Sequence, residues 1–110
     1  MDIRIDLAPE PPSVVLAEPE DCERFQVTVS GGADRSAVAG ALAESGLGRL
    51  DDDASGAHAW IFVSAVRLAA AGRVGPDWPA AFEAMLAYAS SKGWLSAGGE
   101  EIRAHVEWPV

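Results

Sequence analysis

The 110-residue chain is poor in cysteine and in basic residues, and each shortage excludes a class of structure or function. A single cysteine, Cys22, cannot form an internal disulfide or supply a cysteine-based zinc site. Eight Lys and Arg residues stand against seventeen Asp and Glu residues, which gives a formal net charge of −9. Because phosphate backbones and anionic membrane surfaces repel such a chain, we predict that it binds neither nucleic acid nor membranes.

Long hydrophobic runs are also missing. The longest, around Ala59 to Val66, is far shorter than the roughly 20 residues that a membrane-spanning helix needs. The first six residues, Met-Asp-Ile-Arg-Ile-Asp, carry alternating charges and lack the apolar segment of a signal peptide. We therefore expect a cytoplasmic protein. The preference for Arg over Lys, with many Ala and Gly residues, is typical of a high-GC bacterial genome.

What is present is ordinary globular composition, with 49% hydrophobic and 23% charged residues, which predicts one folded domain over residues 1–110. Alternation of apolar and polar residues is typical of half-buried strands, and a run that is apolar on both faces is typical of a central strand. The segments with these patterns are residues 2–7, 13–18, 24–30, 58–64 and 101–108.

Three segments have apolar residues at helical spacing instead. The first begins after Asp34, a good capping residue, and ends before Gly46. The second begins at Ser64 and ends at Gly72. The third begins near Asp77 and ends at Gly93. Its apolar stripe contains Trp78, Phe82, Met85, Leu86 and Ala89.

The order of these elements predicts an α+β fold. Three strands precede the first helix, one strand follows it, and two helices precede the last strand. Because several strands have one polar face, the helices should cover only the other. We predict a two-layer sandwich, a mixed β-sheet of about five strands with helices packed on one face.

An acidic segment between two predicted elements resembles half of a calcium-binding loop. Asp51, Asp53, Ser55 and Gly56 fit D-x-D-x-S-G, but Phe62 occupies the position of the bidentate Glu that completes such a loop. Asp, Ser and Gly are also the residues that turns prefer. We interpret the segment as a turn and predict no metal and no cofactor.

The polar face of the last strand is the candidate site. It carries Glu101, Arg103, His105 and Glu107, and His58 is the only other imidazole. If His58 faces the same side, His58, His105 and Glu107 could hold a transition metal. Ordinary cross-strand ion pairs, for instance Arg103 with Asp2 or Asp6, explain the same charges and are favoured.

His105 between Glu101 and Glu107 would also suit general acid–base chemistry. No nucleophile accompanies it, since Cys22 lies among Glu20, Asp21 and Glu23, whose charges should raise the pKa of the thiol.

The four tryptophans, Trp60, Trp78, Trp94 and Trp108, all lie near the ends of predicted elements. We expect most of them in the core, and any that stays exposed beside the polar face would indicate a binding surface.

These patterns favour a non-catalytic protein-interaction or self-associating domain, a homodimer for example, that uses the polar sheet face. The alternative is a small enzyme or a ligand- or metal-binding domain with His105, Arg103 and Glu107 near its site. No pattern in the sequence identifies a substrate.

Overall fold

The structure is a computed structural model that describes residues 1–52 and 55–109. Its strands are β1 (Asp2–Asp6), β2 (Ser13–Ala17), β3 (Gln26–Ser30), β4 (Gly48–Leu50), β5 (His58–Phe62) and β6 (Glu101–Glu107). Its helices are α1 (Arg35–Ser45), α2 (Val63–Ala70) and α3 (Trp78–Ser91).

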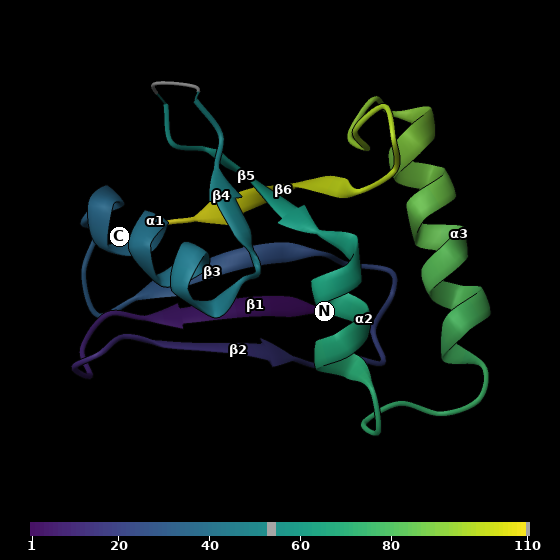
Figure 1. Cartoon of the computed structure of the whole chain (residues 1–110), viewed down its shortest axis with the longest axis horizontal. Coiled ribbons are helices and arrows are strands. Elements are labelled where there is room, and N and C mark those ends of the chain that lie inside the picture. Colours follow the sequence, from purple (N-terminus) through teal and green to yellow (C-terminus); the bar gives the residue numbers. More distant parts are fainter. Residues whose placement is uncertain (53–54, 110) are drawn as a thin grey trace.

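All six strands belong to one mixed sheet in the order β2-β1-β3-β6-β5-β4 (Figure 1). The three central strands β1, β3 and β6 run parallel to one another. β2 is antiparallel to β1 at one edge, whereas β5 and β4 add antiparallel strands at the other. The last strand of the sequence therefore lies in the middle of the sheet.

The helices are arranged around one face and one end of this sheet. α1 and α2 cover the same face and lie in front of the strands in Figure 1. α3 lies along the end of the sheet where β1 and β3 begin. Its buried residues are Trp78, Phe82, Leu86 and Ala89, so the predicted stripe is confirmed apart from Met85, which is half-buried.

The core consists of the inward-facing residues of the strands and the apolar faces of the helices. Ile3, Ile5, Val27 and Ile61 are among its fully buried members. The α+β class is confirmed, and α1 and α2 cover one face as predicted, but α3 lies at the end of the sheet and the sheet has six strands and not five.

The strand that the sequence prediction missed is β4. It has only three residues, too few to show a period-2 pattern. Gly48 lets it approach β5 closely, because a Cβ at this position would lie 2.1 Å from the Trp60 carbonyl oxygen.

Two predicted helix ends are confirmed. The Asp34 carboxylate accepts hydrogen bonds from the backbone N–H groups of Ser36 and Ala37, and Gly46 has a φ of 71°. Beyond α3, the Trp94 N–H donates to the Ala89 carbonyl at 2.9 Å and folds the chain back on the last turn. α2 begins one residue before Ser64, so this serine does not cap it.

β6 confirms the strongest strand prediction. Ile102, Ala104 and Val106 are buried, and β6 pairs with both β3 and β5. Trp108 follows the strand half-buried, and its indole N–H donates to the Gly56 carbonyl at 2.7 Å. Within residues 1–52 and 55–109, no helix is long and apolar enough to cross a membrane.

Candidate binding pocket on the open face of the sheet

The face of the sheet opposite α1 and α2, called the open face below, carries the polar residues of the alternating strands. In β6 these are the four residues predicted from the sequence, and in β5 they include His58 and Trp60. Because the core residues between them point to the helices, the register of the strands decides which open-face side chains become neighbours.

That register places a row of alternating Trp and Arg residues across four segments. Arg103 of β6 lies opposite Trp60 of β5, which lies opposite Arg49 of β4. On the other side of Arg103 lies Trp94, whose carbonyl accepts the Arg103 backbone N–H at 2.7 Å. We call Trp94, Arg103, Trp60 and Arg49 the Trp–Arg row. The Arg49 guanidinium lies 5.9 Å from the Trp60 ring centroid, within the range of a cation–π contact.

The two histidines are neighbours in the next register position. His58 pairs directly with His105, and their ring centroids are 6.1 Å apart in an edge-to-face arrangement. Nδ1 of His58 is buried and has no hydrogen-bond partner among the described residues. The condition set by the sequence, that His58 share a sheet face with His105, is therefore met.

A pocket of about 230 Å³ opens between the histidines and the end of the Trp–Arg row. Five residues line it: Phe25, His58, Trp94, Arg103 and His105. Two aromatic rings, two imidazoles and one guanidinium thus meet in one place, and no carboxylate belongs to the lining. In a chain with a net charge of −9, this lining gathers N–H donors that can bind an anion, although Asp51 pairs with Arg103 and Glu107 lies near His105.

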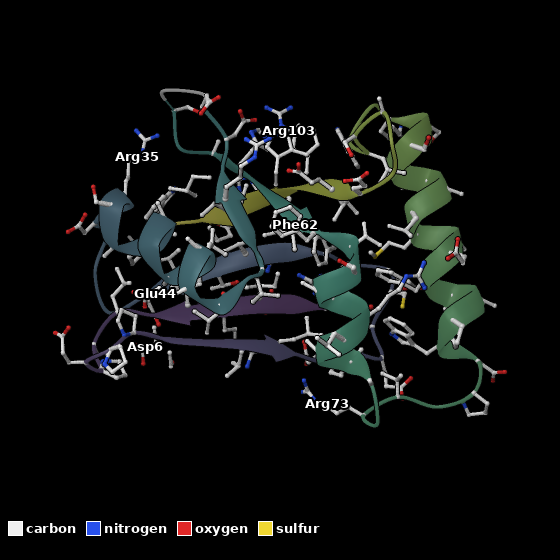
Figure 2. The ribbon with its side chains drawn as sticks, viewed as in Figure 1. Asp6, Arg35, Glu44, Phe62, Arg73 and Arg103 are labelled. Carbon is white, nitrogen blue, oxygen red and sulfur yellow. The ribbon has the colours of Figure 1, made fainter. Side chains whose placement is uncertain are left out.

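Arg103 is held in place by an acid from a loop and not from β1. Its Nε donates to Asp51 Oδ2 at 3.1 Å. Figure 2 labels Arg103, and Asp51 directly follows β4 in the connection to β5. The predicted pairing of Arg103 with Asp2 or Asp6 is therefore wrong. Asp2 contacts Arg4 and Thr28 instead, because β3 separates β1 from β6 in the sheet.

The two glutamates of the candidate site do not line the pocket. Glu107 lies at its border, with Oε1 3.7 Å from Nε2 of His105. Glu101 lies at the far end of β6, where its Oε2 is 3.4 Å from the Arg49 guanidinium. The structure thus brings Arg103, His105 and His58 together and leaves Glu101 outside.

The tryptophans have three different environments. Trp78 is buried, as expected, whereas Trp60 and Trp108 are only half-buried. Trp94 is 42% exposed beside the open face and makes an edge-to-face contact with Tyr88, which is 57% exposed. Trp94 is thus the exposed tryptophan that the sequence analysis took as a mark of a binding surface.

The acidic segment of the calcium hypothesis is described only in part, since Asp53 lies outside the described residues. Asp51 accepts a hydrogen bond from Arg103, and the Asp51 backbone N–H donates to the His58 carbonyl at 3.0 Å. Among the described residues, no group of three or more His, Cys, Asp or Glu side chains is placed to hold a metal ion.

Cys22 lies away from the pocket, in the loop between β2 and β3. Burial raises the pKa of its thiol, with smaller contributions from Asp21 and Glu20, while the N-terminal ammonium acts in the opposite direction. The direction agrees with the sequence analysis, but burial and not the neighbouring acids is the main cause. A raised pKa leaves little thiolate at neutral pH and makes Cys22 a poor nucleophile.

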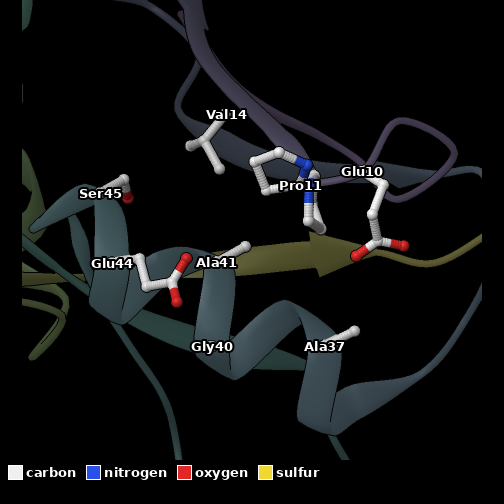
Figure 3. Close-up of a pocket in the computed structure, with 9 residues that line it drawn as sticks. Glu10, Pro11, Val14, Ala37, Gly40, Ala41, Glu44 and Ser45 are labelled. Carbon is white, nitrogen blue, oxygen red and sulfur yellow. The ribbon is translucent and has the colours of Figure 1, made fainter.

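A second cavity, of about 410 Å³, lies between α1 and the connection from β1 to β2 (Figure 3). Its walls are small or apolar residues such as Pro11, Ala37 and Gly40, and the carboxylates of Glu10 and Glu44 lie at its border. None of the residues predicted to form the site belongs to it.

No protein-family model, curated protein or solved structure matches this chain. The assignment of a function therefore depends on the geometry of the open face.

Phe25 and Trp94 of the pocket and Trp60 of the Trp–Arg row were not among the five predicted site residues, although an exposed tryptophan beside the polar face was expected to mark a binding surface. Phe25 precedes β3, and Trp94 lies in the segment after α3, so their positions depend on long-range strand pairing. A second sequence signal for Trp94 was its location directly after the helix-ending Gly93, where a large apolar residue often folds back.

Proposed function

We propose that this chain is a non-catalytic protein-interaction domain that self-associates through the open face of its sheet. The observation that supports this most is the Trp–Arg row. Trp and Arg are the residue types most enriched among the energetic hot spots of protein interfaces. The exposed rings of Phe62 and Trp94 lie at opposite sides of β6 and extend the apolar area of this face.

The partner we propose is a second copy of the chain, because charges on the open face are better balanced than on the rest of the molecule. Three of the seven arginines lie on it, and each is close to an acid. Two open faces can therefore meet with little repulsion, while the acidic remainder of each chain points away. Dimers with two-fold symmetry are the commonest oligomers and use the same patch on both subunits.

The test is the mass in solution, measured by light scattering over a range of concentrations at low and high salt. We expect a dimer that is strengthened by salt, since screening weakens the repulsion between two chains of net charge −9. Phe62→Ala should weaken the dimer, whereas Leu68→Ala, at an exposed position of α2, should leave it unchanged. A monomer at millimolar concentration at both salt concentrations refutes self-association.

We place this function in the bacterial cytoplasm, on the support of the composition alone. The lone, half-buried Cys22 suits a reducing compartment, where thiols persist.

The second candidate function is a small ligand-binding domain, and the pocket between Phe25 and His105 favours it. In this role Arg103 and His105 contact the ligand directly and Glu107 contacts His105. The five described lining residues include no Ser, Thr, Cys, Lys, Asp or Glu, so an enzymatic version of this candidate would have to use the imidazoles of His58 and His105.

A further inference from the structure

We propose that the open-face pocket binds a small aromatic carboxylate. This inference rests on the second candidate function and does not require self-association. Its support comes from the size of the pocket, the chemistry of its walls and the charges around it.

The size of the pocket selects a ligand with a single ring. Pockets for drug-sized ligands have volumes of about 300–1,000 Å³, and this one has about 230 Å³. That volume equals roughly seven or eight water molecules at about 30 Å³ each. It accommodates one aromatic ring with a short polar substituent and leaves no room for a nucleotide.

The walls select a flat ring. Phe25 and Trp94 come from segments far apart in the sequence and contribute two aromatic surfaces to one pocket. Aromatic rings prefer offset-stacked or edge-to-face neighbours, and Trp94 already makes one such contact with Tyr88 at 6.0 Å. A ligand ring would add a further contact of the same kind.

The charged groups select a carboxylate. The Asp51 carboxylate engages Nε of Arg103 and fixes the orientation of the guanidinium. The remaining guanidinium N–H groups make no hydrogen bond to a described residue, and their planar arrangement matches the two oxygens of a carboxylate. His58 and His105 supply further N–H donors on the same side.

The same two histidines should make binding dependent on pH. Histidine is the side chain that ordinarily gains its positive charge between pH 8 and 5, and an anion between two imidazoles favours the charged form. The groups around the pair are Glu107 and Arg103 of β6, Gln26 of β3 and Asp51 of the β4–β5 connection. Among the described residues, the carboxylate found within 4 Å of these rings is that of Glu107, with Oε1 3.7 Å from Nε2 of His105. Affinity should therefore rise as pH falls from 8 to 6.

The binding experiment uses the full chain, at concentrations where light scattering shows a monomer, and isothermal titration calorimetry. The probes are benzoate, benzyl alcohol, benzylammonium and acetate. We expect saturable binding of benzoate and at least about tenfold weaker binding of the other three, because each lacks the ring or the negative charge. Equal binding of benzyl alcohol and benzoate overturns the proposal.

Single substitutions in the folded protein test which side chains contribute to benzoate binding. Arg103→Gln and Trp94→Leu should each weaken benzoate binding about tenfold, the effect of losing one charge-assisted contact or one aromatic wall. Arg4→Gln changes an arginine of the same face outside both the pocket and the Trp–Arg row and should have no effect. His58→Gln and His105→Gln together should remove most of the pH dependence and keep the circular dichroism spectrum. Unchanged benzoate affinity in folded Trp94→Leu and Arg103→Gln refutes the site.

The same carboxylate chemistry has two sources, a free aromatic acid or the C-terminal aromatic residue of a protein. An N-acetylated tripeptide that ends in Phe distinguishes them, with its C-terminal amide as the control. If benzoate binds and the peptide acid does not, the ligand is a free acid. If the peptide acid binds more tightly than benzoate and its amide does not bind, the ligand is a chain terminus. Failure of both acids overturns the proposal, whereas the mass of Phe62→Ala tests self-association separately.

Discussion

Phe82 of α3 provides the sharpest test of how the later helices pack against one another. Its side chain is fully buried, and its ring stacks on that of Trp78 with centroids 4.6 Å apart and an angle of 10° between the planes. The guanidinium of Arg67 from α2 also lies 4.9 Å from the Phe82 ring centroid. Phe82 therefore connects both later helices, and Phe82→Ala should loosen both.

The expected loss can be calculated from these contacts. Replacing a fully buried Phe with Ala costs about 3–5 kcal/mol, and a stacked aromatic pair of this geometry places Phe82 in the middle or upper part of that range. With about 2.1 cal/mol/K per residue, unfolding 110 residues has an entropy of about 0.23 kcal/mol/K. A loss of about 4 kcal/mol therefore lowers Tm by about 17 °C.

The assay is thermal and urea unfolding followed by circular dichroism, with two companion variants. Phe82→Leu keeps most of the apolar volume and should cost less than about 1.5 kcal/mol. Leu68→Ala removes a side chain that is 79% exposed and should be nearly neutral. A loss below about 1 kcal/mol for Phe82→Ala would refute the packing of α3 described above.

Four further predictions follow from other elements. Deleting β6 should leave an unfolded or aggregated chain with red-shifted Trp fluorescence, since β6 joins the two halves of the sheet; a truncated chain with cooperative melting would contradict this. Gly48→Ala should lower the free energy of unfolding by about 1–3 kcal/mol, because its Cβ would collide with the Trp60 carbonyl. Gly40→Ala in α1 is the control: its Cβ meets nothing within 4 Å, and the substitution should raise the free energy of unfolding by about 0.5–1 kcal/mol in chemical unfolding. Burial raises the pKa of the Cys22 thiol only in the folded protein, so alkylation of Cys22 should reach half its maximal rate at a higher pH in the folded than in the urea-unfolded protein. The free energy of unfolding should fall as pH rises through this range, because the folded protein then binds more protons than the unfolded chain. Millimolar Ca²⁺ should raise Tm no more than Mg²⁺ does if residues 51–57 are a turn, and a calcium-specific rise of several degrees would contradict that interpretation.

The sequence predicted an element correctly where the local spacing of its apolar residues alone identifies the side chains that face the core. The alternation in β1, β3 and β6 and the stripe of α3 depend only on local spacing, and the structure confirms them. β4 was missed because three residues carry no period and because its pairing depends on a glycine that fits closely against Trp60. The strand order also could not be predicted, since it depends on contacts between distant segments.

The candidate site also combines features that local spacing predicts with features that depend on the pairing of distant strands. That Arg103 and His105 share a face follows from their spacing of two residues in one strand. That His58 lies opposite His105 depends on the register between β5 and β6, which no local pattern encodes. The wrong partner predicted for Arg103 has the same origin, because no local pattern indicates that β3 lies between β1 and β6.

The core determines this register and, through it, the site. Ala59 and Ile61 alternate with His58 and Trp60 in β5, and both are completely buried opposite Ala104 and Ile102. A slip of β5 by one residue against β6 would turn His58 and Trp60 toward α1 and α2 and expose Ile61. Such a slip would bury an imidazole and an indole without their present surroundings, at a cost of several kcal/mol in lost apolar burial and unsatisfied polar groups. The pairing of His58 with His105 and of Trp60 with Arg103 is therefore fixed by residues on the opposite face of the sheet. Substitutions in that part of the core, such as Ile61→Ala, should weaken ligand binding at the pocket even though Ile61 does not line it.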